Sequence, residues 1–120
     1  MKLRIKNNSI RFRLTKSDVS QLAEKGFLED SISFGNTALT FAVKATISQT
    51  ITTTFVNDEI TLFLPQHMIF GLANTDKVGF EDKAGDLHVL VEKDFTCLEN
   101  VAEDQSDNYP NPLTDNYKEK

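Results

Sequence analysis

The sequence predicts an α+β fold of mostly antiparallel strands, in which two ββαββ pseudo-repeats form one swapped-hairpin-like barrel with two short helices. The first observation behind this prediction is internal similarity: residues 7–23 resemble residues 57–73, with five identical residue types at equivalent positions. The second is that, in each of these two regions, apolar and polar residues alternate before and after a short predicted helix. Such alternation is typical of half-buried strands. The third is length, because 120 residues are enough for one hydrophobic core but not for two independent ones.

The first pseudo-repeat, predicted over residues 2–46, begins with a hairpin. Within residues 2–14, Leu3 and Ile5 alternate with basic residues before an Asn-Asn-Ser turn, and apolar residues alternate with arginines after it. Period-two alternation places the apolar side chains on one sheet face and the cations on the other. We therefore expect a hairpin with a basic outer face.

A short helix and a second hairpin complete the first pseudo-repeat. Thr15 is a predicted N-cap, and Asp18 stands three positions later, as in a capping box. Gly26 is a predicted C-terminal stop. Strands are then expected over about residues 27–34 and 38–45, joined by a Gly-Asn turn.

The second pseudo-repeat, predicted over residues 47–93, follows the same plan. A threonine-rich strand turns at an Asn-Asp pair into a second alternating strand. Pro65 is expected at the first helical position, where its missing N–H would be unpaired anyway. The helix should end near Ala73, and a last hairpin should pair residues 77–81 with residues 86–92.

Domain organisation follows from where this periodicity ends. Residues 1–98 are predicted to form a single domain, whereas residues 99–120 are polar, acidic and interrupted by prolines, so we expect a mobile tail. The formal net charge of the chain is −5, and residues 1–98, with 11 basic and 12 acidic residues, contribute only −1 of it. A basic start and an acidic tail therefore flank a nearly neutral domain.

Composition narrows the class of protein. No apolar run approaches the ~20 residues of a membrane span, and the charged N-terminus lacks the apolar stretch of a secretory signal. Cys97 is the single cysteine, which excludes a disulfide framework and a thiolate zinc cluster. We therefore expect a cytoplasmic protein of bacterial type that has no membrane partner.

Hairpin–helix–hairpin units of this length resemble the AbrB/MazE-like swapped-hairpin fold, and several short motifs agree. In MazE-type antitoxins the first turn commonly reads Gly-Asn-Ser, with an arginine four positions after the serine and a proline two positions beyond the arginine. Thr15 stands at the proline position of the first pseudo-repeat, and the second keeps the proline. The matching residues are Asn8, Ser9, Arg13, Pro65, Asp76, Val78 and the strand over residues 87–91. The resemblance covers roughly residues 3–93 and implies an intramolecular pseudo-dimer.

The whole chain also resembles a small family of uncharacterised bacterial proteins. These open with Arg-x-Lys-x-Asn-Ser-x-Arg, here residues 4–11, and carry Val-Glu-Lys-Asp-Phe-x-Cys-Leu, here residues 91–98. They also share a Pro-Asn-Pro tail, here residues 110–112. This second resemblance implies no particular function.

The leading functional hypothesis is that the basic N-terminal hairpin binds an anionic partner, of which DNA or RNA is the most concrete example. In the resembled fold, paired basic hairpins lie on DNA, and arginines and the turn asparagine reach bases and phosphates. The candidate residues are Lys2, Arg4, Lys6, Asn8, Arg11 and Arg13. The second pseudo-repeat has Thr61 and Phe63 where the first has arginines, which reduces the phosphate contacts available to the protein.

Other interpretations remain open. A basic strand face also protects a sheet edge from aggregation, and the acidic tail could fold back on that face. The MazE-type resemblance implies instead an antitoxin-like protein-interaction module that acts through the tail and an apolar surface of the second pseudo-repeat. Its candidate residues are Phe63, Phe70, Tyr109 and Leu113.

Catalysis has little support in the sequence. His67 and His88 have no partner at the spacing that a metal site requires. The five glycines form no phosphate-binding loop. We therefore expect a non-enzymatic binding protein without a metal or any other cofactor.

Overall fold

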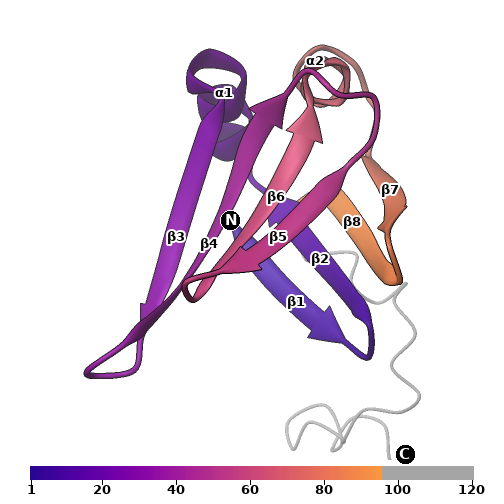
Figure 1. Ribbon diagram of the computed structural model, residues 1–120. Helices are drawn as coiled ribbons and strands as arrows, with labels where there is room; N and C mark the ends of the chain where they lie inside the picture. Colours follow the sequence, from indigo (N-terminus) through magenta and orange to yellow (C-terminus); the bar gives the residue numbers. More distant parts are fainter. Residues whose placement is uncertain (96–120) are drawn as a thin grey trace, which may run out of the picture.

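The computed structural model describes residues 1–95, which form two β-sheets beneath two short helices (Figure 1). The order ββαββ occurs twice along this part of the chain. The elements are β1 (Lys2–Lys6), β2 (Ser9–Leu14), α1 (Lys16–Lys25), β3 (Phe27–Ser33), β4 (Ala38–Thr46), β5 (Thr52–Val56), β6 (Glu59–Pro65), α2 (Gln66–Asn74), β7 (Gly79–Ala84) and β8 (Leu87–Lys93). The predicted α+β class with two short helices is confirmed for these residues.

Each sheet combines a hairpin from the first half of the described chain with a hairpin from the second half. Sheet A has the strand order β1-β2-β8-β7, and sheet B has the order β3-β4-β6-β5. The two hairpins of a sheet meet along parallel central strands, β2 with β8 and β4 with β6, while the other pairs are antiparallel. Both sheets are consequently mixed.

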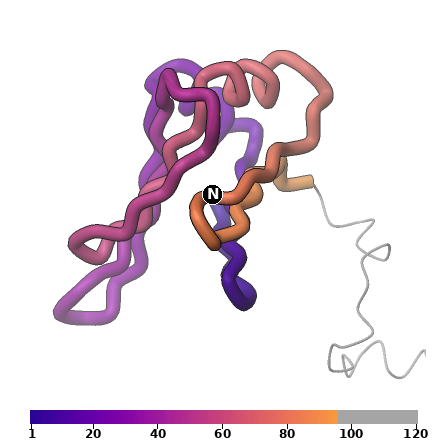
Figure 2. The backbone as a smooth tube through the Cα atoms, turned by 45° about the vertical axis from the view of Figure 1, so that its right-hand side comes forward, coloured from indigo at the N-terminus to yellow at the C-terminus, as the bar shows by residue number. Residues whose placement is uncertain are grey.

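The predicted closed barrel is wrong for the residues described. The sheets lie together beneath the helices and diverge towards the hairpin tips (Figure 2).

Two edge strands carry an aspartate that points inward. Asp30 of β3 and Asp82 of β7 lie in register with the core-facing residues Phe41 and Val89. Inward-pointing charges protect an edge strand from further pairing. The Ile51 N–H donates to Asp82 Oδ2 at 3.2 Å, so a side chain links the two sheets there.

The hydrophobic core fills the end of the molecule where the sheets meet the helices. Phe12, Leu62 and Val89 have no exposed surface, and Leu22 of α1 and Leu72 of α2 pack into the same cluster. Burying a side chain of this size stabilises the fold by about 1.5–3 kcal/mol. Large apolar side chains remain exposed near the diverging tips, among them Ile5, Ile32, Phe34 and Phe55.

Helix α1 begins and ends as predicted, whereas α2 differs at its start. Thr15 Oγ1 accepts the Asp18 N–H at 3.1 Å, and the Asp18 carboxylate accepts the Thr15 N–H at 2.9 Å, which completes the capping box. Gly26 ends α1 with a φ of 73°, a conformation that glycine adopts without steric cost. Pro65 is the N-cap of α2 and not its first helical residue, because its ψ of 141° still belongs to β6.

Tight turns connect the strands of three hairpins. Asn7 has a φ of 53°, and Asn57 and Asp58 have φ values of 52° and 61°. Asparagine and aspartate tolerate this left-handed region better than most residues. The last hairpin turns through Gly85, with a φ of 68°, so β7 extends to Ala84 where we predicted an end near residue 81.

Candidate nucleic-acid interface

The side of sheet A that faces away from the core gathers basic residues from three strands. Leu3 of β1 and Phe12 of β2 face the core. Because successive side chains of a strand point to opposite faces, the basic residues that alternate with these apolar residues face outward. The strand register places Arg4 directly beside Arg11. We call this surface the cationic face and define it as Lys2, Arg4, Lys6, Arg11, Arg13 and Lys83.

Carboxylates from the end of the described chain neutralise part of the cationic face. The Glu92 carboxylate lies 3.6 Å from Arg11 Nε and 3.7 Å from Arg13 Nε. Lys2 Nζ lies 3.1 Å from Asp94 Oδ2. The two arginine side chains are 30% and 33% exposed, and pairs this accessible contribute at most about 1 kcal/mol each. An incoming phosphate can therefore compete for the guanidinium groups.

A further carboxylate lies on the same side of sheet A at β7. Glu81 Oε2 lies 3.6 Å from His88 Nε2, and the imidazole is a cation only when protonated. Among the described residues of this surface, six basic side chains therefore face three carboxylates, Glu81, Glu92 and Asp94. Counted over residues 1–95, the cationic face therefore has a net positive charge.

Asn8, a predicted nucleic-acid contact, has a structural role. Its side-chain amide donates to the Asp86 carbonyl oxygen at 2.8 Å, and its own carbonyl accepts the His88 N–H at 3.0 Å. These bonds tie the β1–β2 turn to the last hairpin at the tip of sheet A. Contact between Asn8 and a nucleic acid stays a prediction.

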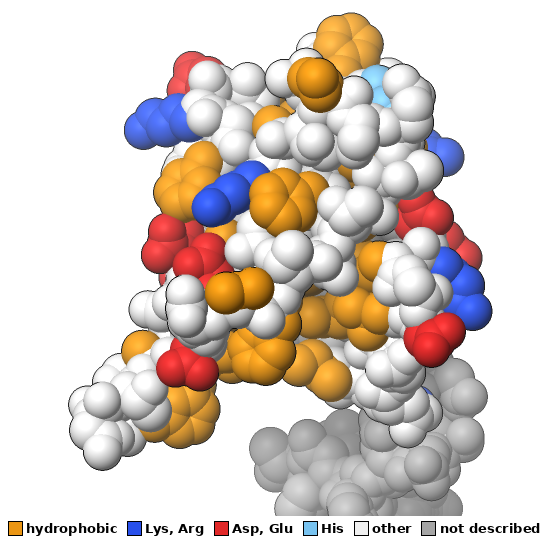
Figure 3. Space-filling model, viewed as in Figure 1, with side chains coloured by type: hydrophobic (Ala, Val, Ile, Leu, Met, Phe, Trp, Pro, Cys, Tyr) orange, Lys and Arg blue, Asp and Glu red, His pale blue; other side chains and the backbone are white. Residues whose placement is uncertain are grey.

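The outward side of sheet B carries a different surface. Thr52 and Thr54 occupy outward positions in β5, and Phe63 occupies one in β6. Lys44 of β4 lies over the Phe27 ring, with its Nζ 5.7 Å from the ring centroid. In Figure 3, uncharged and hydrophobic side chains predominate over the middle of this sheet. The structure thus places the basic cluster on one sheet only among the residues it describes.

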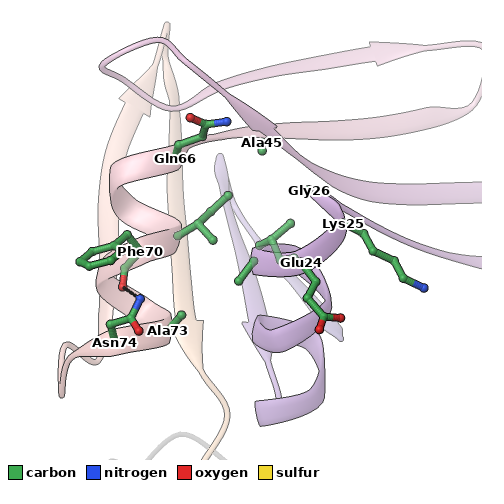
Figure 4. A pocket seen from close by; sticks show the side chains of 11 residues that line it. Glu24, Lys25, Gly26, Ala45, Gln66, Phe70, Ala73 and Asn74 are labelled. Carbon is green, nitrogen blue, oxygen red and sulfur yellow. Dashed lines mark hydrogen bonds between the residues drawn. The ribbon is translucent and has the colours of Figure 1, made fainter.

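The two predicted protein-interaction residues of the second half, Phe63 and Phe70, lie on different surfaces. Phe63 pairs in register with Lys44 on the outward side of sheet B. Phe70 of α2 is 64% exposed, and its ring points away from α1 (Figure 4). Tyr109, Leu113 and the predicted acidic tail lie outside the described residues.

A cavity of about 530 Å³ lies between the two helices (Figure 4). Small side chains line it, including Ala23 from α1, Ala73 from α2 and Ala45 from β4. Its charged lining residues are Glu24 and Lys25, and its described lining includes no histidine or cysteine. This lining offers no nucleophile with an adjacent base, which acyl or phosphoryl transfer would need.

Residues 1–95 hold no group of three or more His, Cys, Asp or Glu side chains placed to bind a metal ion. Every buried polar side-chain atom in this range has a hydrogen-bond partner. The same part of the chain has no helix with the length and apolar character needed to cross a membrane. Cys97 lies outside the described residues.

Sequence reasoning missed the contribution of the last hairpin to the cationic face. Lys83, His88 and Glu92 reach this surface because β8 pairs in parallel with β2. Alternation within residues 87–93 does indicate that His88 and Glu92 share a face opposite Val89. The missing information was which strand lies beside them.

Comparisons with known proteins give a family match without a function. A family described as "Family of unknown function (DUF7009)" matches residues 1–113. No curated protein and no solved structure matches significantly. These findings do not support the predicted AbrB/MazE-like relationship.

Proposed function

The chain belongs to the DUF7009 family, a family of unknown function, and we propose from its surface that it is a small cytoplasmic binding protein and not an enzyme. Its cationic face binds an anionic partner, and nucleic acid is the most concrete candidate. One observation carries the proposal: six basic side chains from three strands lie on the same side of one sheet.

The dimensions of the cationic face suit a phosphate backbone. Outward residues two positions apart on a strand are separated by about 6.6 Å, and neighbouring strands by about 4.8 Å. From Lys2 to Lys6, β1 therefore spans about 13 Å, a length of duplex helix axis along which each strand presents about four phosphates. Binding through so few contacts should be weak, independent of sequence and sensitive to salt.

Fluorescence anisotropy with a random-sequence DNA duplex across a salt series tests this proposal. We expect binding at low salt that weakens as salt rises. The double variant Arg11→Gln, Arg13→Gln should weaken binding and lower the salt slope by about 2, since two phosphate contacts are lost.

The matched control for this experiment is Lys25→Gln with Lys44→Gln, which removes two cations outside the cationic face. It changes the net charge equally, so it should reduce binding far less than the arginine pair if the contact is local. Absence of binding by the full chain at low salt, or equal losses in the two double variants, would exclude the proposal.

A second candidate function is the antitoxin-like protein-interaction module. The observation that favours it is the outward side of sheet B, where Phe63, Lys44 and Phe27 lie in one register row beside threonines. Interfaces are enriched in aromatic residues. In this proposal the acidic residues 99–120 wrap the partner.

The two candidate functions respond oppositely to the same changes. Removing residues 99–120 should abolish co-purification of a protein partner and leave anion binding in place. The double variant Arg11→Gln, Arg13→Gln should weaken anion binding and leave the co-purification of a protein partner unchanged. A partner that co-purifies equally with the shortened chain would exclude the tail as its binding segment.

We also infer that the two halves arose from one duplicated ββαββ unit related to the swapped-hairpin fold. If each of β1–β4 is exchanged with its counterpart in β5–β8, the strand order of sheet A becomes β5-β6-β4-β3. This is the order of sheet B read from its other edge. Asn7 and Asn57 share a left-handed backbone, with φ values of 53° and 52°. The identical pairs are Asn7 and Asn57, Ile10 and Ile60, Leu14 and Leu64, Leu22 and Leu72, and Ala23 and Ala73. Halves that fail to superpose in an experimental structure would refute this inference.

A further inference from the structure

The two sheets have four edge strands within residues 1–95, and one of them carries no charge. The edges are β1 and β7 in sheet A, and β3 and β5 in sheet B. Strand β1 carries three cations, β3 carries two adjacent acids, and β7 carries both signs. Strand β5, with the sequence Thr-Thr-Thr-Phe-Val, has no ionisable side chain. Charged residues on an edge discourage association with another chain, and β5 lacks this protection.

The edge of β5 is open beyond its first residues. Ile51, which precedes the strand, donates its N–H to Asp82 Oδ2 at 3.2 Å, so a side chain of β7 occupies the edge at this point. Further along, Phe55 and Val56 are 69% and 59% exposed. Threonine, phenylalanine and valine favour extended structure. The open part of β5 is therefore suited to pairing with another strand.

The tight turn after β5 determines which of its backbone groups point outward. Val56 and Glu59 flank a two-residue turn, so they form a hydrogen-bonded pair, and every second residue of β5 directs its N–H and C=O groups to β6. Thr53 and Phe55 alternate with these residues and direct their backbone groups to the open edge. Ile51 lies two positions before Thr53, so its N–H also points to the open edge. Its bond to a side chain outside sheet B agrees with this direction.

We propose that β5 pairs in antiparallel fashion with β5 of a second copy of this chain, which joins two copies of sheet B into one continuous sheet. A two-fold axis at Thr54 places Thr53 opposite the partner's Phe55, so the outward backbone groups of both strands are used. A threonine opposite a phenylalanine is a favourable cross-strand pair. Thr54 faces the partner's Thr54 as a non-hydrogen-bonded pair.

Charge favours a second copy at β5 over self-pairing of β1 or β3. Self-pairing of β1 would place lysines and arginines opposite each other, and self-pairing of β3 would do the same with Glu29 and Asp30. Like charges directly opposite each other are unfavourable. Two copies of β5 bring together only threonine, phenylalanine and valine. The two-fold contact is also closed, because both copies use the same edge, β5, and leave no β5 edge for a third chain.

Sedimentation equilibrium of the full chain measures this association. The apparent mass should rise with concentration from 13.5 kDa towards twice that value. Half-association is expected on the order of 100 µM, because one strand pair buries far less than the roughly 1,000 Å² of a stable interface. A wild-type mass that stays at 13.5 kDa up to about 1 mM would overturn the proposal.

A lysine on the two-fold axis is the sharpest change to this contact. Thr54→Lys places two cations opposite each other and should abolish the rise in mass. Ser31→Lys adds the same charge on the outward side of β3, the other edge of sheet B, and should leave the association unchanged. Association that persists in Thr54→Lys would overturn the proposal.

A cross-linking test remains decisive if Thr54→Lys does not fold. Non-hydrogen-bonded antiparallel pairs have Cα atoms about 4.5 Å apart, within the range of a disulfide. In a Cys97→Ser background, Thr54→Cys treated with diamide should form a dimer on a non-reducing gel, as two thiols give their protons and electrons to the diamide. Ser31→Cys is the control and should cross-link far less. Equal cross-linking of both variants would contradict the proposed register.

Discussion

Asp18 connects the start of the chain to the start of α1. Its carboxylate lies 2.9 Å from the Met1 ammonium and accepts the Thr15 N–H at 2.9 Å. Burial by itself would raise the pKa of Asp18, but the hydrogen bonds from the ammonium and from Thr15 outweigh it, and the pKa lies below the ordinary value of 3.8. The carboxylate is therefore easier to ionise in the folded chain than in the unfolded chain, and its ionised form stabilises the fold.

Asp18→Asn should lower the free energy of unfolding at neutral pH by about 1–2 kcal/mol, as the loss of a cap does. Because the folded-state pKa is lowered, this stabilisation is complete above pH values near 3.8 and is lost as the pH falls through the folded-state pKa. Urea unfolding across pH should therefore show the wild type and the variant converging in acid. Glu24→Gln changes an exposed residue of the same helix and should show neither effect. A difference that persists undiminished in strong acid would contradict this account.

Glu92 controls how available two arginines of the cationic face are. Glu92→Gln keeps the shape of the side chain and removes the charge that lies 3.6 Å from Arg11 Nε and 3.7 Å from Arg13 Nε. Duplex DNA should then bind more tightly at low salt, with a salt slope larger by about 1. Anisotropy titrations measure this change, and Glu29→Gln on β3 is the charge-matched control. An equal gain in both variants would show that total charge acts and that the local ion pairs do not.

At the scale of elements, β7 passes close to β8 at its first residue. A Cβ added to Gly79 would lie 2.5 Å from the Val91 carbonyl oxygen and 2.9 Å from Glu92 Cα. Both of these atoms are backbone atoms of the neighbouring strand, so they cannot move aside as a side chain could. The close approach of the two strands therefore depends on glycine at this position.

Gly79→Ala should destabilise the protein by about 2 kcal/mol, as overpacking does. Gly71→Ala is the control, because its added methyl would meet the end of the Phe80 ring at 3.2 Å and alanine is favoured over glycine in a helix by about 1 kcal/mol. The control should thus stay close to the wild type in urea unfolding. Equal destabilisation by both variants would show that the close strand contact is not the cause.

Elements with local signals were predictable from the sequence, and their partners in the sheets were not. The bounds of α1 follow from Thr15, Asp18 and Gly26, which lie within a few residues of the ends they determine. Alternation also gave the outward direction of the basic residues in β1 and β2. It does not specify neighbours, so the pairing of Ser9 with His88 could not be derived, nor could the approach of Glu92 to the arginines.

At the scale of the whole molecule, an acidic chain carries a basic sheet face. Residues 99–120 contain six acidic and two basic residues, which accounts for −4 of the net charge of −5. Acidic residues on the same chain repel a polyanion and compete with it for cations, and both effects weaken as salt rises. The acidic end of the chain should therefore act against the proposed binding.

A chain ending at residue 98 should bind duplex DNA more tightly than the full chain at low salt. The difference should diminish above about 0.1 M salt, where the screening length falls to roughly 10 Å. Parallel anisotropy titrations of the two chains measure it. Weaker binding by the shortened chain would instead make residues 99–120 part of the binding surface.

The parallel pairing of β2 with β8 also determines the order in which the two sheets can form during synthesis. Sheet B consists of four strands that follow one another along the chain, whereas sheet A joins Ser9 to a residue about 80 positions later, His88. Closing so long a loop is entropically costly and slow compared with forming local hairpins. On the ribosome, sheet B can therefore assemble while synthesis continues, and the N-terminal hairpin waits with its apolar side uncovered. Sheet A can form only after the last hairpin has left the exit tunnel.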